Sequence, residues 1–293
     1  MAHKAGFVNI IGAPNVGKST LMNVLVGENL SIITSKAQTT RHRIMGIVNG
    51  EDFQVVYSDT PGVLKPNYKL HQSMMEFVNS ALDDADVILF VTDIFEDIKI
   101  DERTIERIKT AHAPVLLLIN KIDLADQEKL EAKVAYWKTV FDKAEVIPVS
   151  ALQKFNVNYV FDRIRDLLPE SPAYFDKDEL TDKSQRFFVS EIIREKILKY
   201  YSKEIPYSSE VVVNSFKESP EIVRIQADII VERDTQKGII IGHQGQALKK
   251  LGTLARKDIE EFVGNKVYLE LLVKVDKDWR NSESHLRRFG YIK

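Results

Sequence analysis

The segment GAPNVGKS, residues 12–19, contains the residues whose types and spacing most directly suggest chemistry. It matches the pattern G-x-x-x-x-G-K-[ST] and begins where an apolar stretch ends. Gly12 and Gly17 allow a tight backbone turn whose N–H groups can face phosphate oxygens. Lys18 is spaced to reach the β- and γ-phosphates of a nucleotide, and Ser19 to ligate Mg²⁺. A helix after them would add its positive N-terminus, so the segment predicts a phosphate-binding loop.

A second motif, DTPG at residues 59–62, follows the apolar stretch FQVVYS. Asp59 is expected to hold Mg²⁺ through a water molecule, the role of a Walker-B aspartate. Gly62 would leave its backbone N–H available to the γ-phosphate. Alone, this tetrapeptide is more often an ordinary turn. Its place at a strand end, after a phosphate-binding loop, favours the nucleotide site.

Two further motifs predict that the base is guanine. NKID (120–123) ends one apolar stretch and SAL (150–152) ends the next. The carboxylate of Asp123 can accept two hydrogen bonds from the N1–H and N2–H₂ edge of guanine, a donor pair that adenine lacks. Asn120 would brace the loop, and the stem of Lys121 would cover one face of the base. These motifs are specific because all four occur in order.

The elements that must position these motifs are buried strands alternating with amphipathic helices. Five apolar runs predict strands: GFVNIIG (6–12), FQVVYSD (53–59), DVILFVTD (86–93), PVLLLIN (114–120) and AEVIPVS (144–150). Helical patterns separate them, for example near 69–84, which predicts an α/β fold with a mostly parallel sheet. Ligands bind beyond the carboxyl ends of the strands in such sheets, which is where the motifs lie.

The alternation of strands and helices ends at residues 167–182, LLPESPAYFDKDELTD. This segment has two prolines, many charges and no apolar period. We therefore predict a GTP-binding domain over 1–170, a linker over 171–185 and a smaller α+β domain over 186–293. In the last part a helix, two strands, two helices and a strand are expected in the order α-β-β-α-α-β.

The second domain carries its own candidate site. Gly242-His243-Gln244-Gly245 separates the two consecutive helices, and residues 237–257 contain five lysine and arginine residues but no acidic one. Such a stretch can meet phosphates, although a solvated helix face would look the same. The loop and element order resemble a type II KH domain, whose GXXG loop clamps about four nucleotides of single strand. We expect Ile239, Ile240 and Ile241 to floor the groove for the bases.

Composition is ordinary for a soluble globular protein, with 44% hydrophobic and 29% charged residues. There is no cysteine, which excludes disulfides, thiolate metal sites and cysteine nucleophiles. No apolar run approaches the ~18 residues of a membrane span, and the N-terminus lacks a signal-peptide core. We expect a cytoplasmic protein.

The four motifs in the first domain resemble those of the translation-factor-like GTPases. In that resemblance TTR (39–41) is the mobile loop that senses the γ-phosphate, and Thr40, in preference to Thr39, completes Mg²⁺ coordination. Val63 stands where Ras-like enzymes place a water-orienting glutamine, so we expect slow intrinsic hydrolysis. In similar enzymes an asparagine at the position of Asn15 helps hold K⁺ beside the β- and γ-phosphates. Dependence on K⁺ is therefore a hypothesis.

A GTPase domain of this type joined to a type II KH domain resembles the Era family of bacterial ribosome-assembly GTPases, and the resemblance covers nearly the whole chain. It includes QTTRHR, GIIIGHQG and the tail VKVDKDWRNSESHLRRFGY. The family implies GTP and GDP as ligands, small-subunit ribosomal RNA near its 3′ end and the pre-30S particle as partners, and loose membrane association. A monomer is expected, and no DNA partner.

The candidate site residues fall into four groups. The GTP-binding group is Asn15, Val16, Gly17, Lys18, Ser19, Thr20, Asp59, Gly62, Asn120, Lys121, Asp123, Ser150 and Ala151. The catalytic group is Lys18, Asn15, Thr40 and Gly62. The Mg²⁺ group is Ser19 and Thr40, with Asp59 through water. The RNA-binding group is Gly242, His243, Gln244, Gly245, Lys249, Lys250, Arg256 and Lys257.

Some readings stay open at this point. The second domain of a GTPase could instead dock a protein and never touch RNA, although the acid-free stretch argues against this. His243 can stack on a base or donate to a phosphate, but simple exposure is the more common situation. Trp279 can serve as a stacking platform, but packing of the last strand against the C-terminal segment is more common.

Overall fold

The computed structural model describes residues 2–95, 100 and 102–292 of the chain. It consists of two compact units: Met1–Asn67 with His71–Asp182, and Tyr68–Leu70 with Lys183–Lys293. Each unit has its own sheet, with six strands in the first and three in the second.

The sheet of the first unit has the strand order β2-β3-β1-β4-β5-β6. Its strands are β1 (Lys4–Gly12), β2 (Ile44–Asn49), β3 (Phe53–Asp59), β4 (Val87–Asp93), β5 (Val115–Asn120) and β6 (Glu145–Pro148). All neighbours are parallel except β2 and β3, which are antiparallel. The five predicted strands are confirmed, and β2 is an edge strand that the apolar pattern did not reveal.

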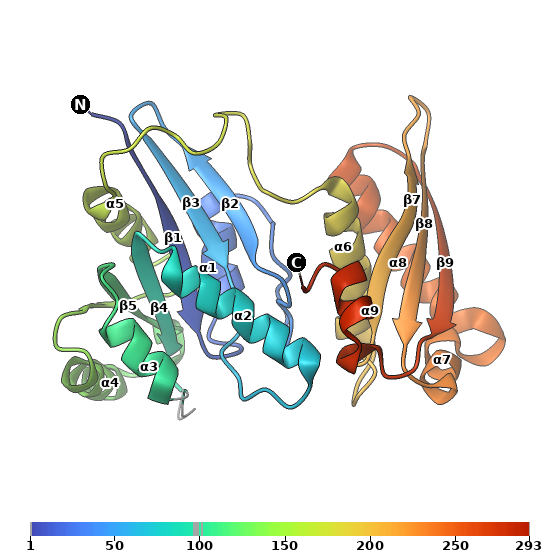
Figure 1. Cartoon of the computed structure of the whole chain (residues 1–293), viewed down its shortest axis with the longest axis horizontal. Helices are drawn as coiled ribbons and strands as arrows, with labels where there is room; N and C mark the ends of the chain where they lie inside the picture. The colour runs from blue at the N-terminus through green and yellow to red at the C-terminus, as the bar shows by residue number, and fades with distance from the viewer. Residues whose placement is uncertain (1, 96–99, 101, 293) are drawn as a thin grey trace. The chain divides into compact units, whose positions relative to one another are not determined.

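Helices cover both faces of this sheet, because its central strands are apolar on both sides. They are α1 (Lys18–Val26), α2 (Lys69–Asp83), α3 (Glu102–Lys109), α4 (Gln127–Val140) and α5 (Val157–Leu167), with the short 3₁₀ helix η1 (Ile122–Leu124) after β5. In Figure 1, α2 and α3 lie in front of the sheet and α1 lies behind it. One apolar cluster joins Val78 of α2, Ile108 of α3 and Trp137 of α4 to Phe90 of β4.

The segment predicted as a linker lies mostly within the first unit. Residues up to Asp182 belong to that unit, and the chain pairs with the outer edge of β2 before it leaves. The backbone N–H of Ile47 donates to the carbonyl oxygen of Leu180 at 2.8 Å. The hydroxyl of Thr181 donates to the carbonyl oxygen of Met45 at 2.7 Å. Hydrogen bonds to β2 therefore hold this segment against the first unit, so it needs no apolar period to be ordered there.

The second unit follows the predicted order α-β-β-α-α-β. Its elements are α6 (Gln185–Tyr200), β7 (Glu210–Lys217), β8 (Val223–Val231), α7 (Asp234–Ile241), η2 (His243–Gly245), α8 (Gln246–Val263), β9 (Val267–Val275), η3 (Trp279–Asn281) and α9 (Glu283–Arg288). β7 and β8 are antiparallel and β8 and β9 are parallel. Alternate residues of the strands and one stripe of each long helix form a single apolar core that includes Ile193, Ile225, Ile240, Leu251 and Val273.

The C-terminal segment of this unit is anchored by Trp279. Its side chain is fully buried, and its indole N–H donates to the carbonyl oxygen of Ser208 at 3.1 Å. The ring of Phe289 packs edge-on against it. Trp279 therefore packs the segment after the last strand against the rest of the unit. Because its ring is buried, it cannot serve as a stacking platform for bases.

Candidate functional site: a nucleotide pocket and a GXXG groove

The phosphate-binding loop joins β1 to α1, and its glycines are required by close approach to neighbouring strands. A Cβ on Gly12 would lie 2.1 Å from the carbonyl oxygen of Val91. Gly17 has φ +97°, and a Cβ there would lie 2.2 Å from Nδ2 of Asn120. Lys18 folds back along the loop and donates to the carbonyl oxygens of Gly12 and Ala13 at 3.1 and 2.8 Å. The loop therefore has a compact shape with its lysine held inside it.

Three side chains meet at the position predicted for Mg²⁺. Ser19 Oγ lies 2.7 Å from Asp59 Oδ2 and 3.0 Å from Thr40 Oγ1, and Thr40 Oγ1 lies 3.1 Å from Asp59 Oδ2. Thr39 does not take part, because its hydroxyl bonds within its own loop. The structure thus brings together Ser19, Thr40 and Asp59, and their ligand roles stay predictions.

The buried carboxylate of Asp59 fits a cation. It is fully buried, and its Oδ1 has no hydrogen-bond partner among the described residues. Burial raises the pKa of Asp59, while the charge of Lys18 and the hydroxyl of Ser19 act in the opposite direction. A divalent cation among hard oxygen ligands would stabilise the charged form. The donor set therefore suits Mg²⁺.

The DTPG segment lies directly against the phosphate-binding loop. A Cβ on Gly62 would come within 2.8 Å of backbone atoms of Pro14, so only glycine fits this approach. The backbone N–H of Val63 donates to the carbonyl oxygen of Gly12 at 3.0 Å. The side chain of Val63 is buried in the apolar cluster beside α2. It therefore faces the core.

The motifs predicted to read guanine converge on one end of the pocket. Asn120 Nδ2 donates to the carbonyl oxygen of Val16 at 2.8 Å, and Asn120 Oδ1 accepts from the backbone N–H of Ala151 at 2.9 Å. The hydroxyl of Ser150 donates to Asp123 Oδ1 at 2.5 Å. Asn120 thus ties the phosphate loop to the SAL motif. Ser150 orients the carboxylate that is predicted to read the base.

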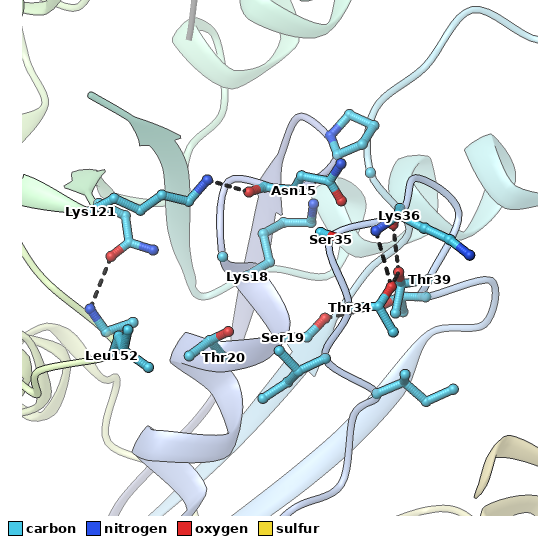
Figure 2. Close-up of a pocket in the computed structure, with 18 of the residues that line it drawn as sticks. Asn15, Lys18, Ser19, Thr20, Thr34, Ser35, Lys36, Thr39, Lys121 and Leu152 are labelled. Atoms are coloured by element: carbon cyan, nitrogen blue, oxygen red, sulfur yellow. Dashed lines mark hydrogen bonds between the residues drawn. The ribbon is translucent and has the colours of Figure 1, made fainter. Parts of the chain in front are cut away.

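The side chain of Lys121 links the phosphate-binding loop to the end of β4. Its backbone is left-handed, with φ 61°. Its ammonium group donates to the carbonyl oxygen of Asn15 at 2.6 Å and pairs with the carboxylate of Asp93 at 2.5 Å. Figure 2 shows the side chain of Lys121 reaching toward Asn15. The ion pair holds the lysine stem extended, as covering a base face requires.

These groups surround a cavity of ≈ 400 Å³. It is lined by eleven predicted residues, namely Asn15, Gly17, Lys18, Ser19, Thr20, Thr40, Gly62, Asn120, Lys121, Asp123 and Ala151. Of the predicted residues, Val16, Asp59 and Ser150 lie behind this lining, with their side chains buried.

Ten residues that line the cavity are not among the predicted site residues. They are Pro14, Ile32, Ile33, Thr34, Ser35, Lys36, Gln38, Thr39, Leu124 and Leu152. Leu152 is the last residue of the SAL motif and Leu124 directly follows Asp123 of NKID, so both could have been found from the guanine motifs. The segment 32–38 comes from the loop before Thr40. Figure 2 shows several of its residues beside the phosphate-binding loop, and nothing in its composition marks it as a pocket wall.

The GXXG loop of the second unit joins α7 to α8. Gly242 and Gly245 have φ 72° and 77°. Gly242 is packed closely, since a Cβ there would lie 2.5 Å from Cβ of Ala247. Gly245 faces open space, and His243 is exposed. A left-handed glycine with nothing above it lets an outside backbone approach closely.

A groove of ≈ 370 Å³ begins at this loop. It is lined by Gly245, Leu248, Lys249, Gly252, Thr253, Arg256, Leu269 and Leu271. The leucines give it an apolar floor, and Lys249 and Arg256 give it a cationic wall. Lys250 and Lys257 are exposed but are not part of this lining.

The expectation that Ile239, Ile240 and Ile241 floor the groove is wrong. Ile240 is fully buried in the core and Ile239 is 54% exposed. Successive residues of a helix point about 100° apart, so three consecutive isoleucines cannot share one face. Leu248 of α8 and Leu269 and Leu271 of β9 provide the floor instead.

The fold and both sites define a class of protein, a P-loop GTPase joined to a type II KH domain. A family model of 50S ribosome-binding GTPases matches residues 7–121, and a KH domain model matches residues 204–280. GTPase Era of Staphylococcus haemolyticus (strain JCSC1435) is 46% identical to this chain over 292 residues, which is 99% of this chain and 98% of that protein. The chain belongs to the Era family of GTPases, and it is a GTPase.

Two solved structures support the same assignment. A crystal structure of Era in complex with MgGDPNP and nucleotides 1506–1542 of 16S ribosomal RNA has a TM-score of 0.95 and 39% identity, and the match covers 99% of this chain and 100% of that chain. A crystal structure of a point variant of Aquifex aeolicus Era bound to GDP.AlF4- has a TM-score of 0.94 and 39% identity over the same shares.

Proposed function

We propose that this GTPase is a nucleotide-controlled RNA-binding factor that assists assembly of the small ribosomal subunit by holding its RNA near the 3′ end. The observation that supports this best is the groove beside the GXXG loop, where open Gly245 adjoins an apolar floor and the cations Lys249 and Arg256. KH domains bind single-stranded nucleic acid in such a groove. A solved relative, Era, is bound to nucleotides 1506–1542 of 16S ribosomal RNA.

The nucleotide pocket would control this function through its two loops. Ser19 and Thr40, with Asp59 through water, would hold Mg²⁺, which neutralises phosphate charge when bound. Lys18 would face the β- and γ-phosphates, and the backbone N–H of Gly62 would donate to the γ-phosphate. The loops at Thr40 and Gly62 then order with GTP and relax after hydrolysis.

Hydrolysis is expected to be slow without a partner. The position after Gly62 holds Val63, which is 6% exposed and packed in the core. A buried valine cannot orient water, so another group must position the nucleophile. A steady-state assay of the purified chain checks this, and turnover near the ~10 s⁻¹ median for enzymes contradicts it.

We also propose that K⁺ assists the reaction beside Asn15. Asn15 is exposed, lines the nucleotide cavity and has φ 66°. A monovalent cation there would add positive charge near the β- and γ-phosphates, where an arginine finger acts in other GTPases. Faster hydrolysis in KCl than in NaCl of equal ionic strength is expected, and equal rates contradict the proposal.

We predict from the family resemblance that the protein is cytoplasmic and associates loosely with the membrane. We also predict that it is a monomer. Among the described residues no helix is long and apolar enough to cross a membrane.

The RNA proposal is tested by Gly245→Asp, alone and combined with Gly242→Asp, in the full chain. The probe is a single-stranded RNA that copies the 3′ end of small-subunit ribosomal RNA. An aspartate at the open position would repel phosphate, so we expect RNA binding to be lost while basal GTP hydrolysis is retained. The single variant is the less disruptive one, because its Cβ meets nothing within 4 Å and adds only the strain of a left-handed backbone at φ +77°.

Two outcomes would contradict RNA binding by this loop. One is unchanged RNA affinity in the Gly245→Asp variant. The other is wild-type binding to RNA without steep salt dependence, which phosphate contacts require. Capture of a protein partner that survives both substitutions would favour the alternative, a protein-docking domain. Crosslinking to cellular RNA with GTP or GDP bound would show whether the nucleotide controls RNA binding.

A further inference from the structure

The loop between α1 and β2 closes over the nucleotide cavity without regular secondary structure. Thr34, Ser35, Lys36, Gln38 and Thr39 all line the cavity. Ordering each residue of such a loop costs ~1–2 kcal/mol of backbone entropy. Something in the loop itself must therefore favour the closed form, or binding of GTP must supply the whole cost.

Three hydrogen bonds join Thr34, Lys36 and Thr39 across this loop. The backbone N–H of Lys36 donates to Thr34 Oγ1 at 3.1 Å. The hydroxyl of Thr39 donates to the carbonyl oxygen of Lys36 at 2.6 Å. Thr34 Oγ1 and Thr39 Oγ1 lie 2.7 Å apart. Figure 2 shows Thr34, Lys36 and Thr39 grouped in this way.

The direction of the third bond follows from counting protons. A threonine hydroxyl has one proton to donate and two acceptor positions. The proton of Thr39 is used on the carbonyl oxygen of Lys36, so Thr34 must be the donor between the two hydroxyls. The bonds then run in a closed circle from Lys36 to Thr34, to Thr39 and back to Lys36. We call these three residues the hydroxyl ring.

Thr39, the last residue of the hydroxyl ring in sequence, directly precedes Thr40, the predicted Mg²⁺ ligand. Thr40 is 7% exposed, with its hydroxyl 3.0 Å from Ser19 Oγ and 3.1 Å from Asp59 Oδ2. The two neighbouring threonines thus face different partners, one in the loop and one in the metal site. Fixing the Thr39 hydroxyl also fixes the peptide group that leads into Thr40.

We propose that Thr34 and Thr39 are positioning residues for GTP recognition. The hydroxyl ring holds the loop in its closed form and presents Thr40 to Mg²⁺ and the γ-phosphate. GDP offers no γ-phosphate to a closed loop, so the ring contributes to the binding of GTP and hardly to that of GDP. The inference rests on the proposed role of Thr40 as a Mg²⁺ ligand.

The test uses Thr34→Val and Thr39→Val in the full chain, because valine keeps the shape of threonine and removes the hydroxyl. Affinities for GDP and for a non-hydrolysable GTP analogue are measured with Mg²⁺. We expect the affinity for the analogue to fall about three- to tenfold, the loss for one or two hydrogen bonds, and that for GDP to change less than twofold. Thr39→Ser keeps a hydroxyl and should restore the analogue affinity.

A second readout does not depend on affinity or activity. The amide proton of Lys36 is bonded to Thr34 only while the ring is closed. With the analogue bound at saturation, hydrogen exchange at Lys36 should be slow in the wild type and faster in Thr34→Val. The matched control is Thr139→Val, which removes an exposed hydroxyl that donates to Tyr136 of α4, and which should change neither measurement.

Thr40→Ala separates failure of the ring from failure of the metal assignment. If Thr40→Ala lowers analogue affinity and the valine variants do not, the hydroxyl ring has no positioning role. If the valine variants lower GDP affinity by as much as analogue affinity, the ring is only structural. If Thr40→Ala has no effect, Thr40 is not the Mg²⁺ ligand and the inference falls with that assignment.

Discussion

The phosphate-binding loop and the GXXG loop both turn into a helix through a left-handed glycine, yet the glycines serve different ends. Gly17 precedes α1 with φ +97°, and Gly245 precedes α8 with φ +77°. A side chain on Gly17 would strike Asn120, whereas a side chain on Gly245 would meet nothing within 4 Å. One glycine is enclosed by the protein and the other lies at the surface.

The difference predicts how substitutions in each loop should act. The nucleotide pocket is held together by contacts within the protein, with the side chain of Asn120 bonded to the backbone of both Val16 and Ala151. The GXXG groove depends on what comes from outside, because its open glycine and its cations face solvent. Substitutions in the first loop should therefore damage the protein and its binding together. Substitutions at Gly245 should act mainly on ligand binding and cost the protein only the strain of a left-handed backbone.

The largest effect is expected for Gly17→Ala. An alanine in this left-handed backbone costs ~1–2 kcal/mol. The clash of its Cβ with Asn120 costs a further ~1–3 kcal/mol. We expect GDP and GTP affinities to fall about 100-fold and the thermal midpoint of the first unit to drop. Titration with fluorescent GDP and a melting curve measure both. A change in affinity below twofold would show that the loop is not enclosed.

An intermediate effect should separate the two glycines of the GXXG loop. Gly242→Ala places a Cβ 2.5 Å from Ala247 and should cost ~2–4 kcal/mol of stability in the second unit. Gly245→Ala adds only the left-handed strain, ~1–2 kcal/mol. Urea unfolding of the full chain, with hydrogen exchange in α8 as the probe, ranks them. Equal costs would mean that Gly245 is as enclosed as Gly242.

The smallest effect tests which cations face RNA. Lys249→Gln with Arg256→Gln changes two cations that line the groove, and Lys250→Gln with Lys257→Gln changes two that do not. The first pair should weaken single-stranded RNA binding about tenfold and reduce the salt slope by ~1.4, or ~0.7 for each lost phosphate contact. The second pair removes the same charge and should cost less than about threefold. Equal losses would favour a diffuse basic surface over the groove.

Several elements were predictable because their residues carry the information locally. β4 and β5 are continuous apolar runs with nearly every residue buried, so their pattern predicts central strands of a parallel sheet. The order α-β-β-α-α-β could be read from periodicity and turn residues in the same way. Thr40 was favoured over Thr39 by family resemblance alone, and the structure places its hydroxyl beside Ser19 and Asp59.

Other elements escaped because their partners lie far away in the chain. β2 has a mixed pattern and is a strand because it pairs with β3 on one side. The segment up to Asp182 has no apolar period because its hydrogen bonds to β2 take the place of apolar burial. Gln54 illustrates this, since it is fully buried while its side chain bonds to the backbone of Tyr174 and Phe175.

The sequence by itself determined the local motifs: a phosphate-binding loop, a carboxylate predicted to read guanine and a GXXG loop, each encoded within a few consecutive residues. Tertiary structure alone decided which neighbours complete each site. It brought residues 32–38 to the pocket wall, turned Val63 into the core and gave the groove floor to Leu269 and Leu271 of β9. The physical reason is that a motif specifies local backbone geometry, whereas burial and closure depend on contacts between segments that are distant in sequence.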